Sequence, residues 1–235
     1  MTTDSQLSIA SGDGRSFHAY VVTPESKPPF PVIVLIQEIF GINENMRWTA
    51  SRFAAAGFLV VAPDLFWRTA PGIELDPMDN QQRARAMELN STFNTREGVS
   101  DCLKTVDQAR RLAASNGRVG AIGYCLGGRL AFLMAIHEHV DAAVCFYPVA
   151  IQPELKASRI SHVPMLIHLG AEDVLCKPEA QTEIKAFVEA GEGNRVFTYP
   201  GVGHGFARLG RAGAAATAAA SAELASIEFL GRYLN

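Results

Sequence analysis

A short segment near the middle of the chain has the residue types and spacing of a nucleophile held at a tight turn. The segment is Gly123-Tyr124-Cys125-Leu126-Gly127-Gly128, and it separates an apolar, β-branched run from a helical pattern. Hydrolases place a nucleophile in the pattern G-x-nucleophile-x-G between a strand and a helix, and here cysteine stands in the serine position. The sequence therefore predicts that Cys125 acts as a nucleophile.

The spacing of the glycines around Cys125 has a physical reason. A strand that turns at once into a helix forces its central residue into a strained backbone conformation, and the neighbours two positions away are crowded. Gly123 and Gly127 relieve that crowding because they carry no side chain. The thiol is then expected at the carboxyl edge of a sheet and beside a helix N-terminus, where the helix dipole favours a thiolate.

A second interpretation of the same glycines is the phosphate-binding turn of a nucleotide-binding fold. Gly120, Gly123 and Gly127-Gly128 resemble such a turn in composition. Their spacing does not match G-x-G-x-x-G, and the turn lies in the middle of the chain rather than after the first strand. The pattern therefore favours the nucleophile turn.

A cysteine nucleophile needs a base and an acid, and hydrolases of this type order them as nucleophile, acid, base. Asp173 follows one predicted strand and His204 follows the next, in the glycine-flanked segment Gly201-Val202-Gly203-His204-Gly205. Both are expected at the same sheet edge as Cys125, with His204 taking the thiol proton and Asp173 fixing the histidine tautomer. Glu172 is the alternative acid.

The other histidines that could carry chemistry are expected to be structural. His137 and His139 are two positions apart near a helix end, so they point to different faces and do not form a metal pair. His168 lies in a predicted strand and is expected to be a core residue with satisfied hydrogen bonds. No cluster with metal-ligand spacing is found, so we expect no metal and no cofactor.

The four cysteines are too sparse for a disulfide framework, and none forms a C-x-x-C pair. This usage is typical of a reducing cytoplasm. Cys102 on a helical stripe and Cys145 in a strand are expected to be buried and inert. Cys176 follows Asp173 closely in the sequence, but we do not expect it to take part in the chemistry.

Short apolar segments alternate with helical patterns along the chain, which predicts a parallel sheet with helical crossovers. The strand-like segments are Pro31–Gln37, Phe58–Ala62, Arg118–Gly123, Ala142–Phe146, Val163–Leu169 and Arg195–Tyr199. The helical patterns are Val99–Ala113, ended by Asn116-Gly117, then Ala131–His139, Glu179–Ala190 and the alanine-rich Ala212–Ala225 with its apolar extension to Leu230. Ser16–Val22 is predicted as one arm of an initial hairpin.

Composition indicates the class of protein and excludes some kinds of binding partner. The chain has 235 residues, 48% of them hydrophobic and 19% charged, and its formal net charge is −3. These values are typical of a globular enzyme without general attraction for nucleic acid or an acidic membrane. The polar segment Thr2–Ser5 is unlike a signal peptide, and no apolar run approaches the length of a membrane span. We expect a cytoplasmic single domain over residues 1–235, as a monomer or small homo-oligomer.

At this point the sequence resembles the dienelactone hydrolase (carboxymethylenebutenolidase) family. The matching stretches, which extend over nearly the whole chain, are Gln37-Glu38-Ile39-Phe40-Gly41, Ala62-Pro63-Asp64-Leu65, the Gly123–Gly128 segment and Gly203-His204-Gly205-Phe206-Ala207-Arg208. The resemblance implies an α/β-hydrolase fold, with a mostly parallel central sheet flanked by helices. It also implies a carboxylic ester hydrolase that converts dienelactone to maleylacetate in the degradation of chlorinated aromatics.

The resemblance also assigns roles to individual residues. It implies that Cys125 is the nucleophile, Asp173 the acid and His204 the base. It further implies a carboxylate at Glu38 that contacts the resting thiol until an anionic substrate enters. The implied substrate-binding residues are Arg83 and Arg208, the backbone N–H groups of Ile39 and Leu126 as an oxyanion hole, and the pocket residues Phe40, Met87 and Asn90.

Three positions depart from the usual pattern of this family. Arg83, Met87 and Asn90 share one predicted helix face, and close relatives often carry aromatic residues at the second and third of these positions. Gly205 stands where serine is common. These departures leave Cys125 and its partners unchanged and affect the expected substrate preference.

The sequence therefore predicts a hydrolase that opens a small anionic lactone. A general carboxylesterase of small esters is the alternative within hydrolases. A non-catalytic thiol switch on the same scaffold is the alternative from another class. Asp173 and His204 separate these classes, because a redox-sensing cysteine has no need of an oriented acid–base pair.

Overall fold

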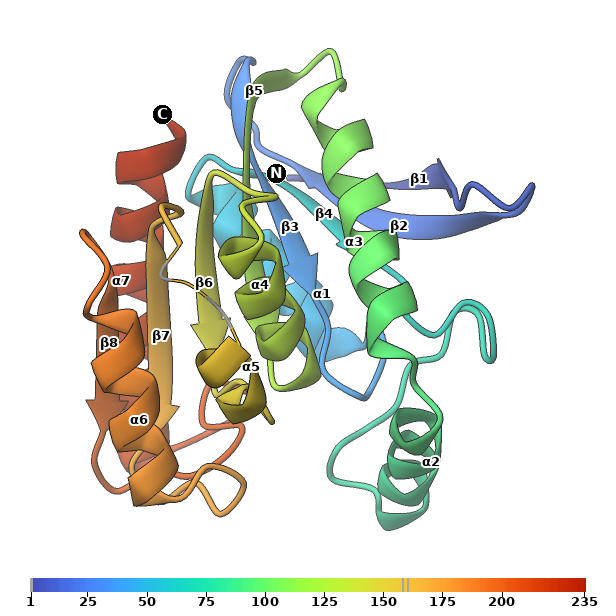
Figure 1. The fold of residues 1–235 in the computed structure, drawn as a ribbon. Coiled ribbons are helices and arrows are strands. Elements are labelled where there is room, and N and C mark those ends of the chain that lie inside the picture. The colour runs from blue at the N-terminus through green and yellow to red at the C-terminus, as the bar shows by residue number, and fades with distance from the viewer. Residues whose placement is uncertain (1, 158, 160) are drawn as a thin grey trace. The chain divides into compact units, whose positions relative to one another are not determined.

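The computed structural model describes residues 2–157, 159 and 161–235 of the chain. These residues divide into two compact units, Met1–Val119 and Gly120–Asn235, which we call the N-terminal unit and the C-terminal unit. Figure 1 draws their helices and strands in chain order from blue to red. The single-domain interpretation of the sequence stays a prediction.

The N-terminal unit contains four paired strands in the order β1-β2-β4-β3. Its strands are β1 (Thr3–Ala10), β2 (Ser16–Thr23), β3 (Phe30–Ile36) and β4 (Leu59–Pro63). β1 with β2 and β2 with β4 pair antiparallel, whereas β3 and β4 pair parallel. Its helices are α1 (Glu44–Ala55), α2 (Asn80–Ser91) and α3 (Thr95–Arg110), with α1 and α3 packed on the strands (Figure 1).

The C-terminal unit contains parallel strands in the order β5-β6-β7-β8. These are β5 (Ser115–Tyr124), which enters the unit at Gly120, β6 (Ala142–Phe146), β7 (Met165–Gly170) and β8 (Arg195–Tyr199). The helices are α4 (Leu126–Ile136), α5 (Gln152–Ala157), α6 (Pro178–Val188) and α7 (Gly213–Leu234). In Figure 1, α4 and α6 lie on the viewer's side of the strands and α7 lies behind them.

The predicted α/β class is confirmed, because strands and helices alternate and most strand pairs are parallel. The buried strands are the continuously apolar runs that two covered faces require, and β6 and β8 have the predicted bounds. Several predicted boundaries are wrong. The helix predicted over Ala131–His139 begins at Leu126 and ends at Ile136. The helix predicted to reach Asn116-Gly117 ends at Arg110, and those two residues lie inside β5. Residues 111–114 form turns instead, and Ala113 of the predicted apolar stripe is exposed.

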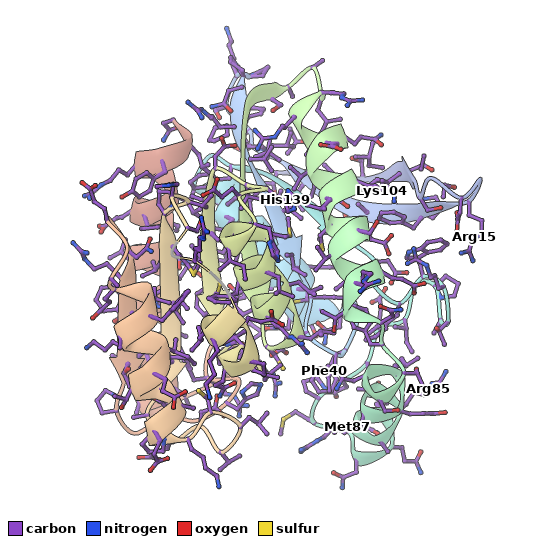
Figure 2. All side chains as sticks on the ribbon, in the orientation of Figure 1. Arg15, Phe40, Arg85, Met87, Lys104 and His139 are labelled. Carbon is purple, nitrogen blue, oxygen red and sulfur yellow. The ribbon has the colours of Figure 1, made fainter. Side chains whose placement is uncertain are left out.

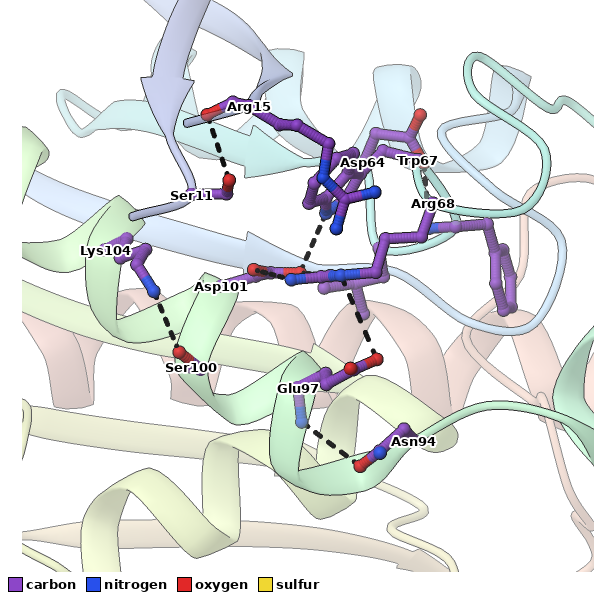
Figure 3. Close-up of polar contacts among 12 residues, drawn as sticks. Ser11, Arg15, Asp64, Trp67, Arg68, Asn94, Glu97, Ser100, Asp101 and Lys104 are labelled. Atoms are coloured by element: carbon purple, nitrogen blue, oxygen red, sulfur yellow. Dashed lines mark hydrogen bonds and ion pairs between the residues drawn. The ribbon is translucent and has the colours of Figure 1, made fainter. Parts of the chain in front are cut away.

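A buried carboxylate joins the segment after β4 to α3 in the N-terminal unit (Figure 3). Asp101 of α3 is fully buried and accepts hydrogen bonds from Trp67 Nε1 at 2.8 Å and from the Arg68 guanidinium, whose Nη2 lies 3.0 Å from Oδ1. The Arg68 guanidinium also lies 4.2 Å from the centre of the Trp67 ring. Because both carboxylate oxygens are paired, burial of this charge is compensated.

His168 of β7 is a core histidine, as the sequence predicted. It is fully buried, with Nδ1 3.0 Å from the Tyr199 hydroxyl and Nε2 3.0 Å from the Ser226 hydroxyl. The Ser226 hydroxyl donates to the Ala222 carbonyl at 2.7 Å, so it accepts from Nε2–H of His168, and Nδ1 accepts from Tyr199. This arrangement suits the neutral ring, and burial lowers the pKa of His168 to about 3.

Stability is expected to fall as the pH drops below the ordinary pKa of histidine, about 6.5. The unfolded chain then binds a proton at residue 168 that the folded chain excludes until the pH approaches 3. Between pH 7 and pH 5 this group alone should reduce the free energy of unfolding by about 2 kcal/mol. Urea unfolding of the wild type and of His168→Gln at both pH values measures how much the free energy of unfolding of each protein changes with pH.

The matched control for that measurement is His139→Gln, a change at an exposed histidine just beyond the end of α4 (Figure 2). It removes an imidazole from the surface and should keep the wild-type pH dependence. Equal pH dependence in the wild type and His168→Gln would contradict the assignment of the acid sensitivity to His168.

None of the helices within the described residues combines the length and hydrophobicity needed to cross a membrane.

Candidate active site

Cys125 lies between β5 and α4 in a strained backbone conformation. Its φ is 54° and its ψ is −110°, whereas residues with a side chain rarely adopt a positive φ. The Cys125 N–H donates to the Phe146 carbonyl at 3.0 Å, which fixes the turn to the end of β6. β5 ends at Tyr124 and α4 begins at Leu126, so the turn consists of Cys125 alone.

The close packing at this turn explains why glycine is required at position 123. A Cβ at Gly123 would lie 1.9 Å from the Gly127 carbonyl oxygen, which no side chain can tolerate. The strand–turn–helix geometry and this crowding are those of a nucleophile elbow. They agree with the favoured interpretation of the sequence and not with a phosphate-binding turn.

The surroundings of the Cys125 side chain favour a negative charge. Cys125 is 7% exposed and precedes the first turn of α4, and among the described residues no side chain makes a capping hydrogen bond to this helix end. The N–H groups of a first helical turn carry a partial positive charge. An anion that forms near Cys125, on sulfur or on a substrate oxygen, is therefore stabilised by the backbone.

Asp173 and His204 form a directed pair within the same unit as Cys125. His204 Nδ1 lies 2.8 Å from Asp173 Oδ2, and the carboxylate is almost fully buried. The other carboxylate oxygen, Oδ1, accepts the Leu175 N–H at 2.8 Å. Since Asp173 holds the proton of the imidazole on Nδ1, Nε2 is the nitrogen that can accept a proton.

The Nε2 atom of His204 is buried and makes no hydrogen bond to any described residue. A buried polar atom without a protein partner is uncommon and marks a position at which a reactant or water can bind. The ring is thus oriented on one side by Asp173 and available on the other.

The structure separates the two candidate acids that the sequence left open. Asp173 is buried and contacts His204, whereas Glu172 is exposed. The backbone N–H of Glu172 donates to the Val202 carbonyl at 3.0 Å, and that of Ala171 donates to the Tyr199 carbonyl at 2.9 Å. These bonds join the loops after β7 and β8, so the loop that carries the acid is held to the loop that carries His204.

Tyr147, which follows β6 directly, was not predicted from the sequence to be near the site. Tyr147 is fully buried, and its ring centre lies 4.9 Å from that of His204 at an interplanar angle of 65°. Its φ is 37°, and its N–H donates to the His168 carbonyl at 2.7 Å. The only signal in the sequence is its position at the end of a strand, at the sheet edge where Cys125, Asp173 and His204 also lie.

Gly205 and Arg208 are packed against each other beyond His204. Gly205 has φ of 70°, and a Cβ at this position would lie 2.7 Å from Cζ of Arg208. A serine here would be strained and would displace the guanidinium. The departure from the family pattern at position 205 therefore accompanies a particular placement of the half-buried Arg208 side chain.

Apart from Leu126, the first residue of α4, the remaining residues assigned by resemblance lie in the N-terminal unit. Glu38 is 2% exposed and follows β3, where Gln37 donates to its carbonyl at 3.3 Å. The residues after it are the half-buried Ile39 and the buried Phe40. The α2 residues are the exposed Arg83, the exposed Met87, which Figure 2 labels, and the half-buried Asn90. Their roles in binding and catalysis stay predictions.

The other cysteines are buried, which confirms the prediction made for Cys102 and Cys145. Burial raises the pKa of Cys102 and Cys145 far above the usual range of a thiol. Cys176 is 2% exposed, and burial together with the charge of Asp173 raises its pKa to about 11. These thiols are poor nucleophiles at neutral pH. Over the described part of the chain, no group of three or more His, Cys, Asp or Glu residues could hold a metal ion.

The parallel strands, the covering helices and the strained strand–turn–helix at Cys125 define the class of protein as an α/β hydrolase. Comparison with known proteins supports this class. The profile of the dienelactone hydrolase family matches residues 17–234.

Two curated relatives show the same similarity over most of their length. The carboxymethylenebutenolidase of Pseudomonas putida is 42% identical over 225 residues, which cover 95% of this chain and 94% of the relative. Carboxymethylenebutenolidase 1 of Cupriavidus pinatubonensis is 37% identical and covers 86% of each chain.

Solved structures show the same fold at lower identity. A dienelactone hydrolase from Anabaena variabilis, 18% identical, matches with a TM-score of 0.71 and covers 100% of this chain and 99% of its own. The esterase 2 of Thermogutta terrifontis with bound propionate, 20% identical, has a TM-score of 0.69 and coverage of 97% and 93%. The chain belongs to the dienelactone hydrolase family and is a hydrolase.

Proposed function

We propose that this hydrolase opens dienelactone, a small anionic enol-lactone, to maleylacetate through Cys125, His204 and Asp173. The observation that carries the proposal is the oriented Asp173–His204 pair, with His204 Nε2 unbonded to described residues, in the same unit as a strained elbow cysteine. The similarity to relatives named carboxymethylenebutenolidase supports the choice of substrate.

In the proposed reaction, His204 Nε2 takes the thiol proton and the Cys125 sulfur attacks the lactone carbonyl carbon. The tetrahedral oxyanion is stabilised by backbone N–H groups at the start of α4, including that of Leu126. Collapse breaks the ring C–O bond, and the protonated His204 gives its proton to the leaving enolate oxygen, which leaves a thioester on Cys125 and a neutral His204. His204 Nε2 then takes a proton from water, whose oxygen attacks the thioester carbonyl carbon. The C–S bond breaks, the Cys125 sulfur takes the proton back from His204, and the freed enol tautomerises to the keto acid.

The Phe146–Tyr147 segment contacts both the proposed nucleophile and the proposed base, which supports their assignment to one site. The Phe146 carbonyl accepts the Cys125 N–H at 3.0 Å, and the next ring contacts the His204 imidazole at 4.9 Å between centres. Because one dipeptide contacts both residues, a shift of either residue is resisted by the same buried segment.

The direct test is turnover of cis- and trans-dienelactone by the purified protein, followed by loss of substrate absorbance. The proposal expects either isomer to be hydrolysed with a kcat/KM well above that for p-nitrophenyl acetate. Hydrolysis of the acetate with no turnover of either lactone would instead indicate a general carboxylesterase. No turnover of any ester would favour a non-catalytic thiol protein. The burial of Cys102, Cys145 and Cys176 argues against that alternative, because a redox-sensing cysteine often has an accessible second cysteine as its disulfide partner.

Replacement of the arginines assigned to the substrate carboxylate should reduce activity selectively. Arg83→Ala and Arg208→Ala are each expected to lower kcat/KM for dienelactone by about ten- to a hundred-fold, since a charged hydrogen bond contributes about 1.5–3 kcal/mol. Activity on neutral p-nitrophenyl acetate should barely change. The measurement is kcat/KM of the wild type and of each variant on both substrates.

Arg85→Ala is the matched control, because Arg85 lies on α2 two positions beyond Arg83 and pairs with Glu88 at 2.6 Å (Figure 2). It should leave both activities unchanged. Equal losses of kcat/KM on the lactone and on the neutral ester would mean that the arginines support the structure and do not bind the substrate carboxylate.

We also propose a cytoplasmic location and a monomeric or small homo-oligomeric state. The four sparse cysteines, all of them buried and none in a disulfide within the described residues, support a reducing compartment.

A further inference from the structure

The side chain of Gln181 contacts both ends of the loop that carries Asp173. Gln181 lies in α6 and is 8% exposed. Its Nε2 donates to the Gly170 carbonyl at 2.9 Å and to the Cys176 carbonyl at 2.8 Å. One amide group therefore joins the last residue of β7 to the residue three positions after Asp173.

The loop between these two carbonyls is closed by its own hydrogen bonds. The Asp173 N–H donates to the Gly170 carbonyl at 3.2 Å, and the Cys176 N–H donates to the Asp173 carbonyl at 3.1 Å. The Leu175 N–H donates to Asp173 Oδ1 at 2.8 Å, which sets the rotation of the carboxylate. The position of Oδ2, which binds His204, thus follows from the conformation of the whole loop.

Only a side chain with two N–H groups on one atom can bridge these carbonyls. The carbonyl groups are acceptors, so a carboxylate in place of the amide would face two oxygens without a proton to share. An apolar side chain of the same length would leave both contacts unmade, and the loss of buried hydrogen bonds would loosen the loop.

We propose that Gln181 is a positioning residue that holds Asp173 Oδ2 at hydrogen-bond distance from His204 Nδ1. The proposal rests on the proposed role of Asp173 as the catalytic acid. Gln181 acts through the Gly170–Cys176 loop and not on the substrate. Its loss should therefore reduce kcat and leave KM nearly unchanged.

Asn194 provides a matched control in the same unit. It is 3% exposed, its Nδ2 donates to the Val188 carbonyl at 3.1 Å, and its Oδ1 accepts the Met165 N–H at 2.8 Å. Met165 begins β7, whereas the Asp173 loop follows the other end of this strand. Asn194→Leu thus removes a comparable pair of buried contacts away from Asp173.

The experiment compares Gln181→Met and Asn194→Leu in steady-state kinetics and in the low-field proton NMR signal of His204 Nδ1–H. We expect Gln181→Met to lower kcat by about ten- to a hundred-fold with KM within about twofold, because small displacements of catalytic groups are costly. The Nδ1–H signal should be broadened or lost. Asn194→Leu should keep the wild-type kcat and signal, even if it is equally destabilised in urea.

A double variant tests whether the effect passes through Asp173. If it does, Gln181→Met added to Asp173→Asn should cause no further loss of kcat. Additive losses, or a wild-type kcat and Nδ1–H signal in Gln181→Met, would overturn the proposal. If Gln181→Met does not fold, Gln181→Glu, which keeps the side-chain length, is judged by the same criteria.

The NMR signal separates failure of this inference from failure of the proposed function. If the wild-type protein hydrolyses none of the esters, the signal in the wild type and Gln181→Met still shows whether Gln181 orients the Asp173–His204 pair. If Asp173→Asn keeps full activity, the assigned acid is wrong, whatever Gln181 does.

Discussion

Cys125→Ala is expected to abolish turnover while the protein remains folded. Without sulfur no thioester can form, and loss of a nucleophile of this kind costs at least about 10⁴-fold in kcat. Alanine keeps the Cβ that the strained position already accommodates, so the elbow at φ of 54° should be retained. Cys125→Ser should also be severely impaired, because a hydroxyl is far less acidic than the thiol. Ester turnover by the purified variants, with circular dichroism as the check of folding, measures both effects.

Cys145→Ala is the control for that experiment. This buried thiol of β6 has a pKa far above the usual range, so it is expected to be inert, and its removal should leave the ester kinetics unchanged. Iodoacetamide should label the wild type at Cys125 and leave the Cys125→Ala protein unlabelled under native conditions. Substantial turnover by Cys125→Ala would refute the covalent route.

The parts of the fold that were predictable from sequence are those that depend on local pattern. The Ala142–Phe146 and Arg195–Tyr199 segments are observed as strands with those bounds. The first is the continuous apolar run that a covered strand requires, whereas the second is an edge strand with β-branched and aromatic residues and is mostly exposed. Glycines at fixed spacing around Cys125 marked the elbow, since close backbone contact leaves no room for other residues.

Features that depend on tertiary contacts were not predictable. Tyr147 adopts φ of 37° because the buried segment around it fixes the chain, and no local pattern signals this. A glutamine in a helix is usually exposed, yet Gln181 is 8% exposed and donates hydrogen bonds to two loop carbonyls. The helix that was predicted to continue to Asn116 ends at Arg110, because turns at residues 111–114 precede β5.

The choice between Glu172 and Asp173 illustrates the same limit. When two adjacent carboxylates follow a strand, the sequence pattern does not indicate which of them contacts the histidine. The turn that begins at Gly170 decides between them, since it buries the second carboxylate against His204 and leaves the first exposed. The difference arises from backbone bonds such as Asp173 N–H to the Gly170 carbonyl, which no residue type specifies alone.

Asp173→Asn is accordingly expected to reduce kcat/KM by about 10³- to 10⁴-fold, and Glu172→Gln by less than about twofold. An asparagine at 173 can present an N–H₂ group to Nδ1, which would favour the tautomer with its proton on Nε2 and remove the acceptor that the thiol proton needs. It also loses the negative charge that stabilises the imidazolium formed in the reaction. Glu172 is exposed, so its neutralisation leaves the Asp173–His204 bond of 2.8 Å in place. Ester kinetics of the two variants at one pH, with urea unfolding as the check of stability, give the ranking. The reverse ranking would transfer the acid role to Glu172, and small losses in both variants would mean that His204 works without a carboxylate partner.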